Sequence, residues 1–106
     1  MDTRHYTYRV IWSDEDVEFV GLCAEFPSLS WLHATMAGAL EGIATAVAAA
    51  AKDMNQAGEA VPEAISTRNY SGKFQVRTTP ARHRLLAVQA AEAGVSINRL
   101  VNDRLA

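Results

Sequence analysis

Three polar side chains with the chemistry to read DNA bases stand at alternate positions in the C-terminal third of the chain: Lys73, Gln75 and Arg77. An arginine guanidinium donates two hydrogen bonds to guanine, and a glutamine amide pairs with adenine in the same two-bond manner. Phe74 and Val76 lie between them, and this alternation predicts a strand with one polar and one apolar face. Lys73, Gln75 and Arg77 are therefore the predicted base-reading residues.

Two helices are predicted to follow and to position that strand. Thr79 and Pro80 have the residue types of an N-cap and a first helical turn, and Gly94 is suited to end the helix. Ser96 is suited to cap a second helix, whose first backbone N–H groups form an anion site. The predicted DNA phosphate-binding residues are Ser96, Ile97 and Asn98.

The strand-helix-helix module at residues 71–106 has only one strand and is too short to close a core of its own. Folds below about 40 residues usually need oligomerisation, metal or disulfides. The chain has one cysteine, which excludes an internal disulfide and is typical of a reducing cytoplasm. We therefore expect the strand to pair with its copy in a homodimer, as an antiparallel ribbon that fits the major groove of double-stranded operator DNA. Pairing of dimers into a tetramer stays open.

Charge divides the chain into two unequal parts. Residues 1–71 carry ten Asp or Glu and four Lys or Arg, a net charge of −6. Residues 72–106 carry six Lys or Arg and two Asp or Glu, a net charge of +4. This asymmetry favours a nucleic-acid-binding tail on an acidic body. The alternative is that the cations form the solvated face of a helical tail.

Residues 1–70 show the pattern of a separate sheet-and-helix domain. Alternating or continuous apolar residues predict strands, and apolar residues at helical spacing after Thr35 predict a long helix that Gly58 ends. The second strand is apolar on both faces, which is typical of the middle of a sheet. The predicted strands cover residues 6–12, 17–26, 29–34 and 65–70, and the helix covers residues 35–56.

The predicted fold class is therefore α+β. A small β-β-β-α-β domain at residues 1–70 would precede a ribbon-helix-helix module at residues 71–106.

Enzymatic and metal chemistry find little support in the residues. Cys23 and His33 could form a nucleophile pair on neighbouring strands, but no third group is in place to orient the histidine. The acidic run at residues 14–16 has the composition of a solvated turn, and His5, His33 and His83 lack the spacing of zinc ligands. We expect no catalytic residue, no metal and no cofactor.

The chain is also expected to be cytoplasmic. The first residues contain no apolar segment of a secretory signal. The most apolar stretch, at residues 42–51, is too short to span a bilayer.

The tail resembles the Arc/MetJ ribbon-helix-helix family. The resemblance rests on the run G-K-F-Q-V-R-T-T-P and on the later run A-A-E-A-G-V-S-I-N-R-L-V. In that family three alternating strand residues face the bases, and these positions match Lys73, Gln75 and Arg77. The family's glycine-x-serine-x-asparagine turn matches Gly94, Ser96 and Asn98, where the helix N-terminus holds a phosphate.

The whole chain is similar to HicB antitoxins. The similarity rests on the order of the predicted elements, on F-P-S-L, on A-L-E-G-I and on the link Y-S-G-K-F into the tail. This resemblance implies an N-terminal toxin-binding domain and a C-terminal DNA-binding domain. The implied partner is a HicA-like ribonuclease toxin, whose contact residues the sequence does not identify. The alternative is a stand-alone ribbon-helix-helix repressor whose N-terminal domain oligomerises or binds a ligand.

Overall fold

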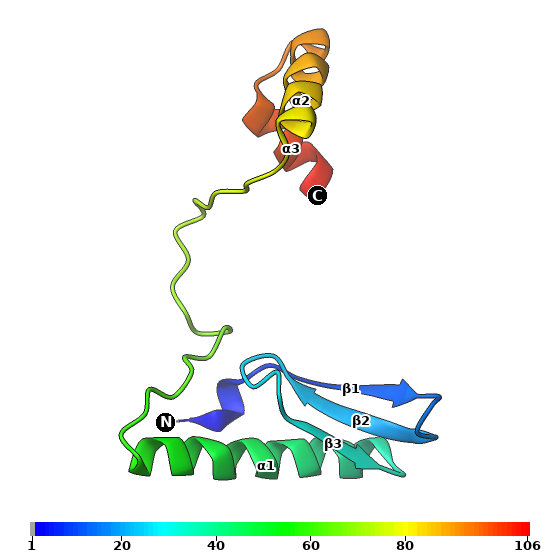
Figure 1. Cartoon of the computed structure of the whole chain (residues 1–106), viewed down its shortest axis with the longest axis vertical. Helices are drawn as coiled ribbons and strands as arrows, with labels where there is room; N and C mark the ends of the chain where they lie inside the picture. The colour runs from blue at the N-terminus through cyan, green and yellow to red at the C-terminus, as the bar shows by residue number, and fades with distance from the viewer. Residues whose placement is uncertain (1) are drawn as a thin grey trace. The chain divides into compact units, whose positions relative to one another are not determined.

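The computed structural model describes residues 2–106, which divide into two compact units, Met1–Tyr70 and Ser71–Ala106. The first unit is an antiparallel sheet of β1 (Tyr8–Ser13), β2 (Glu18–Cys23) and β3 (Ser30–His33), with β2 in the centre (Figure 1). The central position of β2 confirms the prediction drawn from its two apolar faces. Val17, predicted as the first residue of this strand, lies instead in the β1–β2 turn with a φ of 53°.

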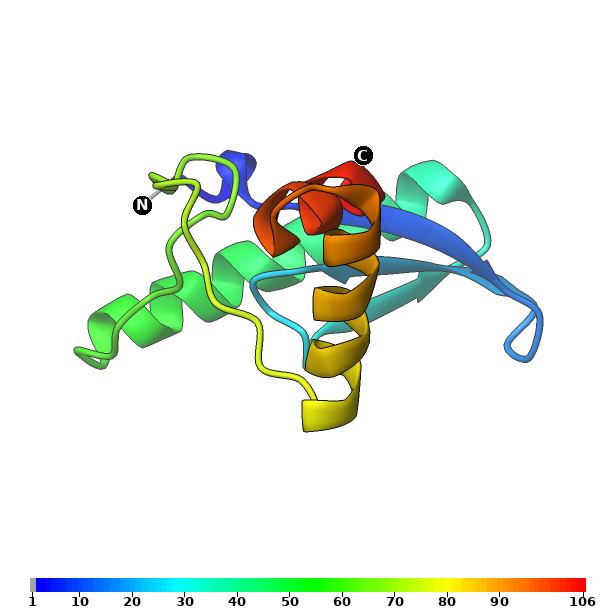
Figure 2. The ribbon, with the colours of Figure 1, turned by 90° about the horizontal axis from the view of Figure 1, so that it is seen from above.

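The helix α1 (Met36–Gln56) crosses one face of this sheet (Figure 2). As predicted, it starts at Thr35, whose hydroxyl accepts a hydrogen bond from the Gly38 N–H at 3.0 Å. The helix approaches β2 so closely that a Cβ on Gly21 would collide with the carbonyl oxygen of Ala39. The core between helix, sheet and neighbouring loops comprises Tyr6, Cys23, Phe26, Ile43, Val47, Ala51 and Ala64.

The predicted fourth strand at residues 65–70 does not form, and the β-β-β-α-β order is therefore wrong. The N–H of Ile65 donates to the Glu25 carboxylate at 2.9 Å, so it is not available to a neighbouring strand. The N–H groups of Thr67 and Arg68 both donate to the carbonyl of Ala64, which makes a turn. The α+β class stands, with three antiparallel strands and one helix in this unit.

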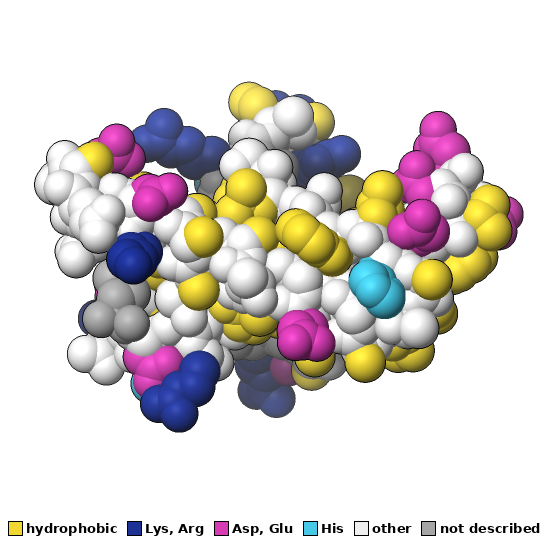
Figure 3. Space-filling view, turned by 90° about the horizontal axis from the view of Figure 1, so that it is seen from below, with side chains coloured by type: hydrophobic (Ala, Val, Ile, Leu, Met, Phe, Trp, Pro, Cys, Tyr) yellow, Lys and Arg dark blue, Asp and Glu magenta, His cyan; other side chains and the backbone are white. Residues whose placement is uncertain are grey.

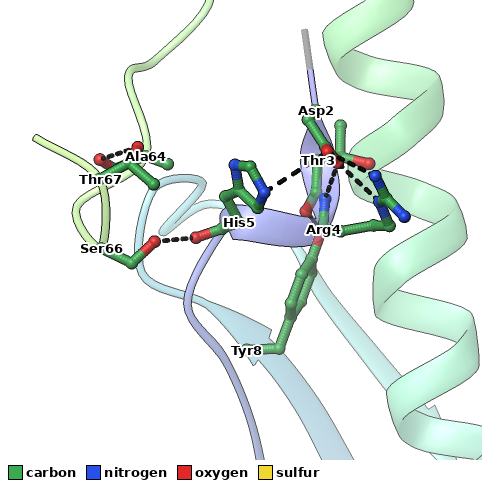
Figure 4. A network of polar contacts seen from close by, with 8 residues as sticks. All are labelled: Asp2, Thr3, Arg4, His5, Tyr8, Ala64, Ser66 and Thr67. Carbon is green, nitrogen blue, oxygen red and sulfur yellow. Dashed lines mark hydrogen bonds and ion pairs between the residues drawn. The ribbon is translucent and has the colours of Figure 1, made fainter.

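The turn at residues 64–67 is attached to the N-terminal segment by polar contacts (Figure 4). The Ser66 hydroxyl donates to the carbonyl of His5 at 2.5 Å, next to the short 3-10 helix η1 (Thr3–His5). The Tyr8 hydroxyl donates to the Thr3 carbonyl at 2.8 Å, which fixes η1 on the sheet. Beside it, the Arg4 guanidinium donates to the Asp2 carboxylate and holds the pKa of Asp2 well below its usual range.

The second unit contains two helices, α2 (Pro80–Ala93) and α3 (Ile97–Leu105), with the boundaries that the capping residues predict. Thr79 accepts a hydrogen bond from a first-turn N–H of α2, and Ser96 does the same for α3. Gly94 ends α2 in the left-handed conformation, with a φ of 68°. The strand predicted at residues 73–78 does not form in the single chain, because a strand requires a second strand beside it.

Glu25 generates a testable dependence of stability on pH. Burial raises the pKa of its carboxyl, but the backbone N–H groups of Ile65 and Thr7 donate to the carboxylate, and the net result is a lowered pKa. A group with a lowered pKa in the folded state stabilises the fold above its unfolded pKa, about 4.3 for glutamate, and loses this effect on further acidification. We expect the free energy of unfolding of the first unit to fall below about pH 4, and we expect a smaller fall in the Glu25→Gln variant.

Both tryptophans, Trp12 and Trp31, lie in the first unit, so their fluorescence during urea unfolding reports on this unit alone. At pH 7 the Glu25→Gln change should lower the free energy of unfolding by about 1–2 kcal/mol. The matched control is Glu63→Gln, which removes an exposed carboxylate 3.7 Å from Arg68 and should have little effect. Equal acid sensitivity of Glu25→Gln and the wild type would contradict the assignment.

Candidate nucleic-acid interface

The three predicted base-reading residues, Lys73, Gln75 and Arg77, lie on one exposed segment directly before α2. A turn precedes them, in which Gly72 has a φ of 82° and the Ser71 hydroxyl accepts the N–H of Lys73 at 3.0 Å. No ladder hydrogen bond of the described chain fixes which side chains of this segment share a face. All three side chains are therefore exposed on one short segment, but the backbone does not place them on a common face.

The predicted phosphate-binding residues lie at the start of α3. The Ser96 hydroxyl accepts the N–H of Arg99 at 3.1 Å, so this donor is already satisfied. The first N–H groups of an α-helix have no acceptor within the helix, and here they belong to Ile97 and Asn98. These donors and the helix dipole favour an anion at this end of α3.

An apolar groove of about 1000 Å³ lies within the second unit. Phe74 and Val76 contribute to it with side chains that are 76% and 74% exposed. Arg77 lines the same groove, because the unpaired segment has no ladder that would turn it to the opposite face. The groove is lined by Phe74, Val76, Arg77, Thr78, Pro80, Arg82, His83, Leu85, Leu86, Gln89, Ile97, Val101, Arg104 and Leu105.

The second unit has almost no core of its own. Ala90 is its only buried residue among those described, and it lies where α3 returns along α2. One side-chain hydrogen bond, from Arg104 to Gln89 at 2.7 Å, links the two helices. Leu85 of α2 also lines the groove, although the sequence pattern did not predict it as a residue of the site. A folded unit of this kind leaves an apolar surface that a further chain can cover.

The structure separates the residues of the alternative nucleophile pair. Cys23 pairs with Tyr8 across the sheet and His33 pairs with Phe19, four residues from Cys23 along β2, or about 13 Å. Burial raises the pKa of the Cys23 thiol, which lowers its reactivity. Nδ1 of His33 accepts the N–H of Thr35 at 3.0 Å.

The acidic turn does not form a metal site. Ser13 donates to Asp16, and Trp12 donates to Asp14. Among residues 2–106, no group of three or more His, Cys, Asp or Glu side chains is placed to hold a metal ion.

Comparison with models of known protein families finds a match in the part of the chain that follows α1. The family model of HicB matches residues 58–105. The HicB match includes the exposed segment, both helices of the second unit and the groove, and it covers slightly less than half of the chain.

Residues 1–57, which contain the sheet and α1, lie outside the HicB match. No curated protein and no solved structure matches the chain. In the part of the chain that the structure describes, no helix has the length and apolar character needed to cross a membrane.

Proposed function

We propose that the protein is the antitoxin of a type II toxin–antitoxin pair. It neutralises a HicA-like mRNA-cleaving toxin and represses its own operon by binding operator DNA. The proposal is supported by the match of the HicB family model to residues 58–105 and by the exposed segment before α2, which carries two cations and a glutamine at alternate positions. Neither job requires catalysis by this chain.

DNA binding in this proposal depends on a homodimer. Residues 73–78 of two chains pair as an antiparallel ribbon, and Phe74 and Val76 enter the groove of the dimer. Pairing fixes the pleat, so Arg77 leaves the groove and joins Lys73 and Gln75 on the opposite face. The ribbon then presents these three residues twice to the major groove, while the N-termini of the two α3 helices hold phosphates through Ser96, Ile97 and Asn98.

The division of charge supports the division of labour. The net charge of +4 over residues 72–106 attracts a DNA polyanion. The net charge of −6 over residues 1–71 suits a toxin that must carry cations in order to hold RNA. We assign toxin binding to the first unit and operator binding to the second.

If residues 73–78 pair in a dimer, two valine substitutions in the second unit should have different effects on the mass of the protein in solution. Val76 is 74% exposed and lines the groove, whereas Val88 is 46% exposed and does not line it. Both positions are classed as exposed in the single chain, so both variants should keep their helices. In sedimentation equilibrium, we expect the wild type and Val88→Lys at twice the chain mass of 11.5 kDa, and Val76→Lys largely monomeric. A wild type that sediments as a folded monomer at micromolar concentration would exclude the ribbon.

Base reading predicts a specific loss for Arg77→Ala. A bidentate arginine–guanine contact contributes roughly 1–3 kcal/mol, and a two-fold dimer makes it twice, so operator affinity should fall by orders of magnitude at fixed salt. Lys73→Ala, if Lys73 contacts phosphate, weakens all sequences alike and flattens the salt dependence. The control is Arg68→Ala, which removes one cation from the first unit and should leave binding unchanged. Operator affinity of Arg77→Ala equal to that of the wild type, with the dimer intact, would rule out this reading element.

The two jobs are expected to be separable in cells. The proposal predicts a HicA-family toxin gene beside this one. Full-length protein should rescue the growth of cells that express that toxin, and Arg77→Ala should rescue equally well while losing repression of an operator–reporter fusion. Operator binding without rescue would instead favour the stand-alone repressor.

A further inference from the structure

The sheet of the first unit has one face that no other element of the first unit covers, among its described residues. α1 occupies the other face, where it contacts Gly21. Because side chains alternate along a strand, Val20 faces away from α1. The strand register places Ile11 of β1 and Leu32 of β3 directly beside Val20. These three residues, Ile11, Val20 and Leu32, form a continuous aliphatic row across the sheet.

The aliphatic row is exposed and has an acidic end. Ile11 is 43% exposed and Leu32 is 46% exposed. Glu18 lies on the same face, two residues before Val20, and the hairpin at residues 14–16 adds three further carboxylates. Figure 3 shows acidic side chains gathered at the hairpin end of this unit. An apolar centre with a charged rim is the usual anatomy of a protein–protein interface.

We propose that the aliphatic row is the surface on which the first unit binds a basic, RNA-cleaving toxin. The inference rests on the proposed antitoxin function and adds the location of the contact. A protein that binds RNA presents cations to phosphates, and these cations complement the carboxylates at the hairpin end. The apolar centre excludes water from the contact, and the acidic end orients the toxin and speeds its association.

Two other occupants of this face suit it less well. A second copy of the first unit would bring a net charge of −6 against the same charge, which opposes association. The second unit of the same chain has the complementary charge, but its large exposed apolar residues lie mainly around its own groove. Both occupants are distinguishable from the toxin in one set of measurements.

The test compares two leucines of equal exposure in the full-length protein. Leu32 lies in the aliphatic row, and Leu40 lies on α1; both side chains are 46% exposed. The probe is a catalytically inactivated form of the HicA-family toxin that the antitoxin proposal predicts to be encoded beside this gene. Calorimetry should show Leu32→Lys weakening toxin binding by about tenfold or more, and Leu40→Lys changing it by less than about twofold. Ile11→Lys is a second variant in the row, and tryptophan fluorescence verifies that each variant is folded.

The outcomes separate this inference from the function on which it rests. Wild-type protein that does not bind the probe would contradict the antitoxin proposal itself. Wild-type binding that both Leu32→Lys and Ile11→Lys retain would overturn the docking surface alone. A lower mass of Leu32→Lys without toxin would show that a second copy occupies the row, and a changed operator affinity with unchanged toxin affinity would assign the row to the second unit.

Discussion

The hydrogen-bonding groups of residues 73–78 impose the constraint on which the second unit depends. An extended backbone carries one donor and one acceptor per residue, and a strand satisfies them only beside another strand. No strand of the described chain lies beside this segment. Phe74 and Val76 are also left exposed over an apolar groove. In the proposed homodimer, a second copy would satisfy both requirements with the same six residues, and that pairing would place Lys73, Gln75 and Arg77 on one surface.

The first unit has a buried core, whereas the second unit has almost none among its described residues. The Ile43 and Val47 side chains of α1 are fully buried against the sheet, and Gly21 lets the helix backbone approach β2 closely. The Glu25 carboxylate joins the chain after α1 to the start of the sheet. A closed core on one face of a sheet leaves the other face free for a partner. The chain thus combines an acidic unit that has a buried core with a basic unit that we propose is completed by its copy.

Local signals in the sequence predicted the elements well. Thr35, Thr79, Gly94 and Ser96 act through neighbours within a few residues, and the structure confirms the helix boundaries that they predict. The predictions were wrong where the decisive partner is distant in sequence or absent. The N–H of Ile65 donates to the carboxylate of Glu25, 40 residues away, and the strand predicted at residues 65–70 does not form.

The candidate site was predictable only in part. The alternation at residues 73–78 indicates a strand, yet its partner lies outside the chain. The base-reading and phosphate-binding residues therefore stay predictions. Leu85 escaped notice because its place in the groove depends on how α3 packs on α2.

Amide hydrogen exchange of residues 73–78 tests the central claim most directly. In an antiparallel ribbon, every second residue forms both of its backbone N–H···O hydrogen bonds with the partner strand. The N–H groups of the residues between them point outward, away from the partner. We predict that alternate amides of this segment are protected, and that dilution below the dimer dissociation constant removes the protection. Uniformly rapid exchange along the segment, at a concentration where the protein has the mass of a dimer, would contradict the account.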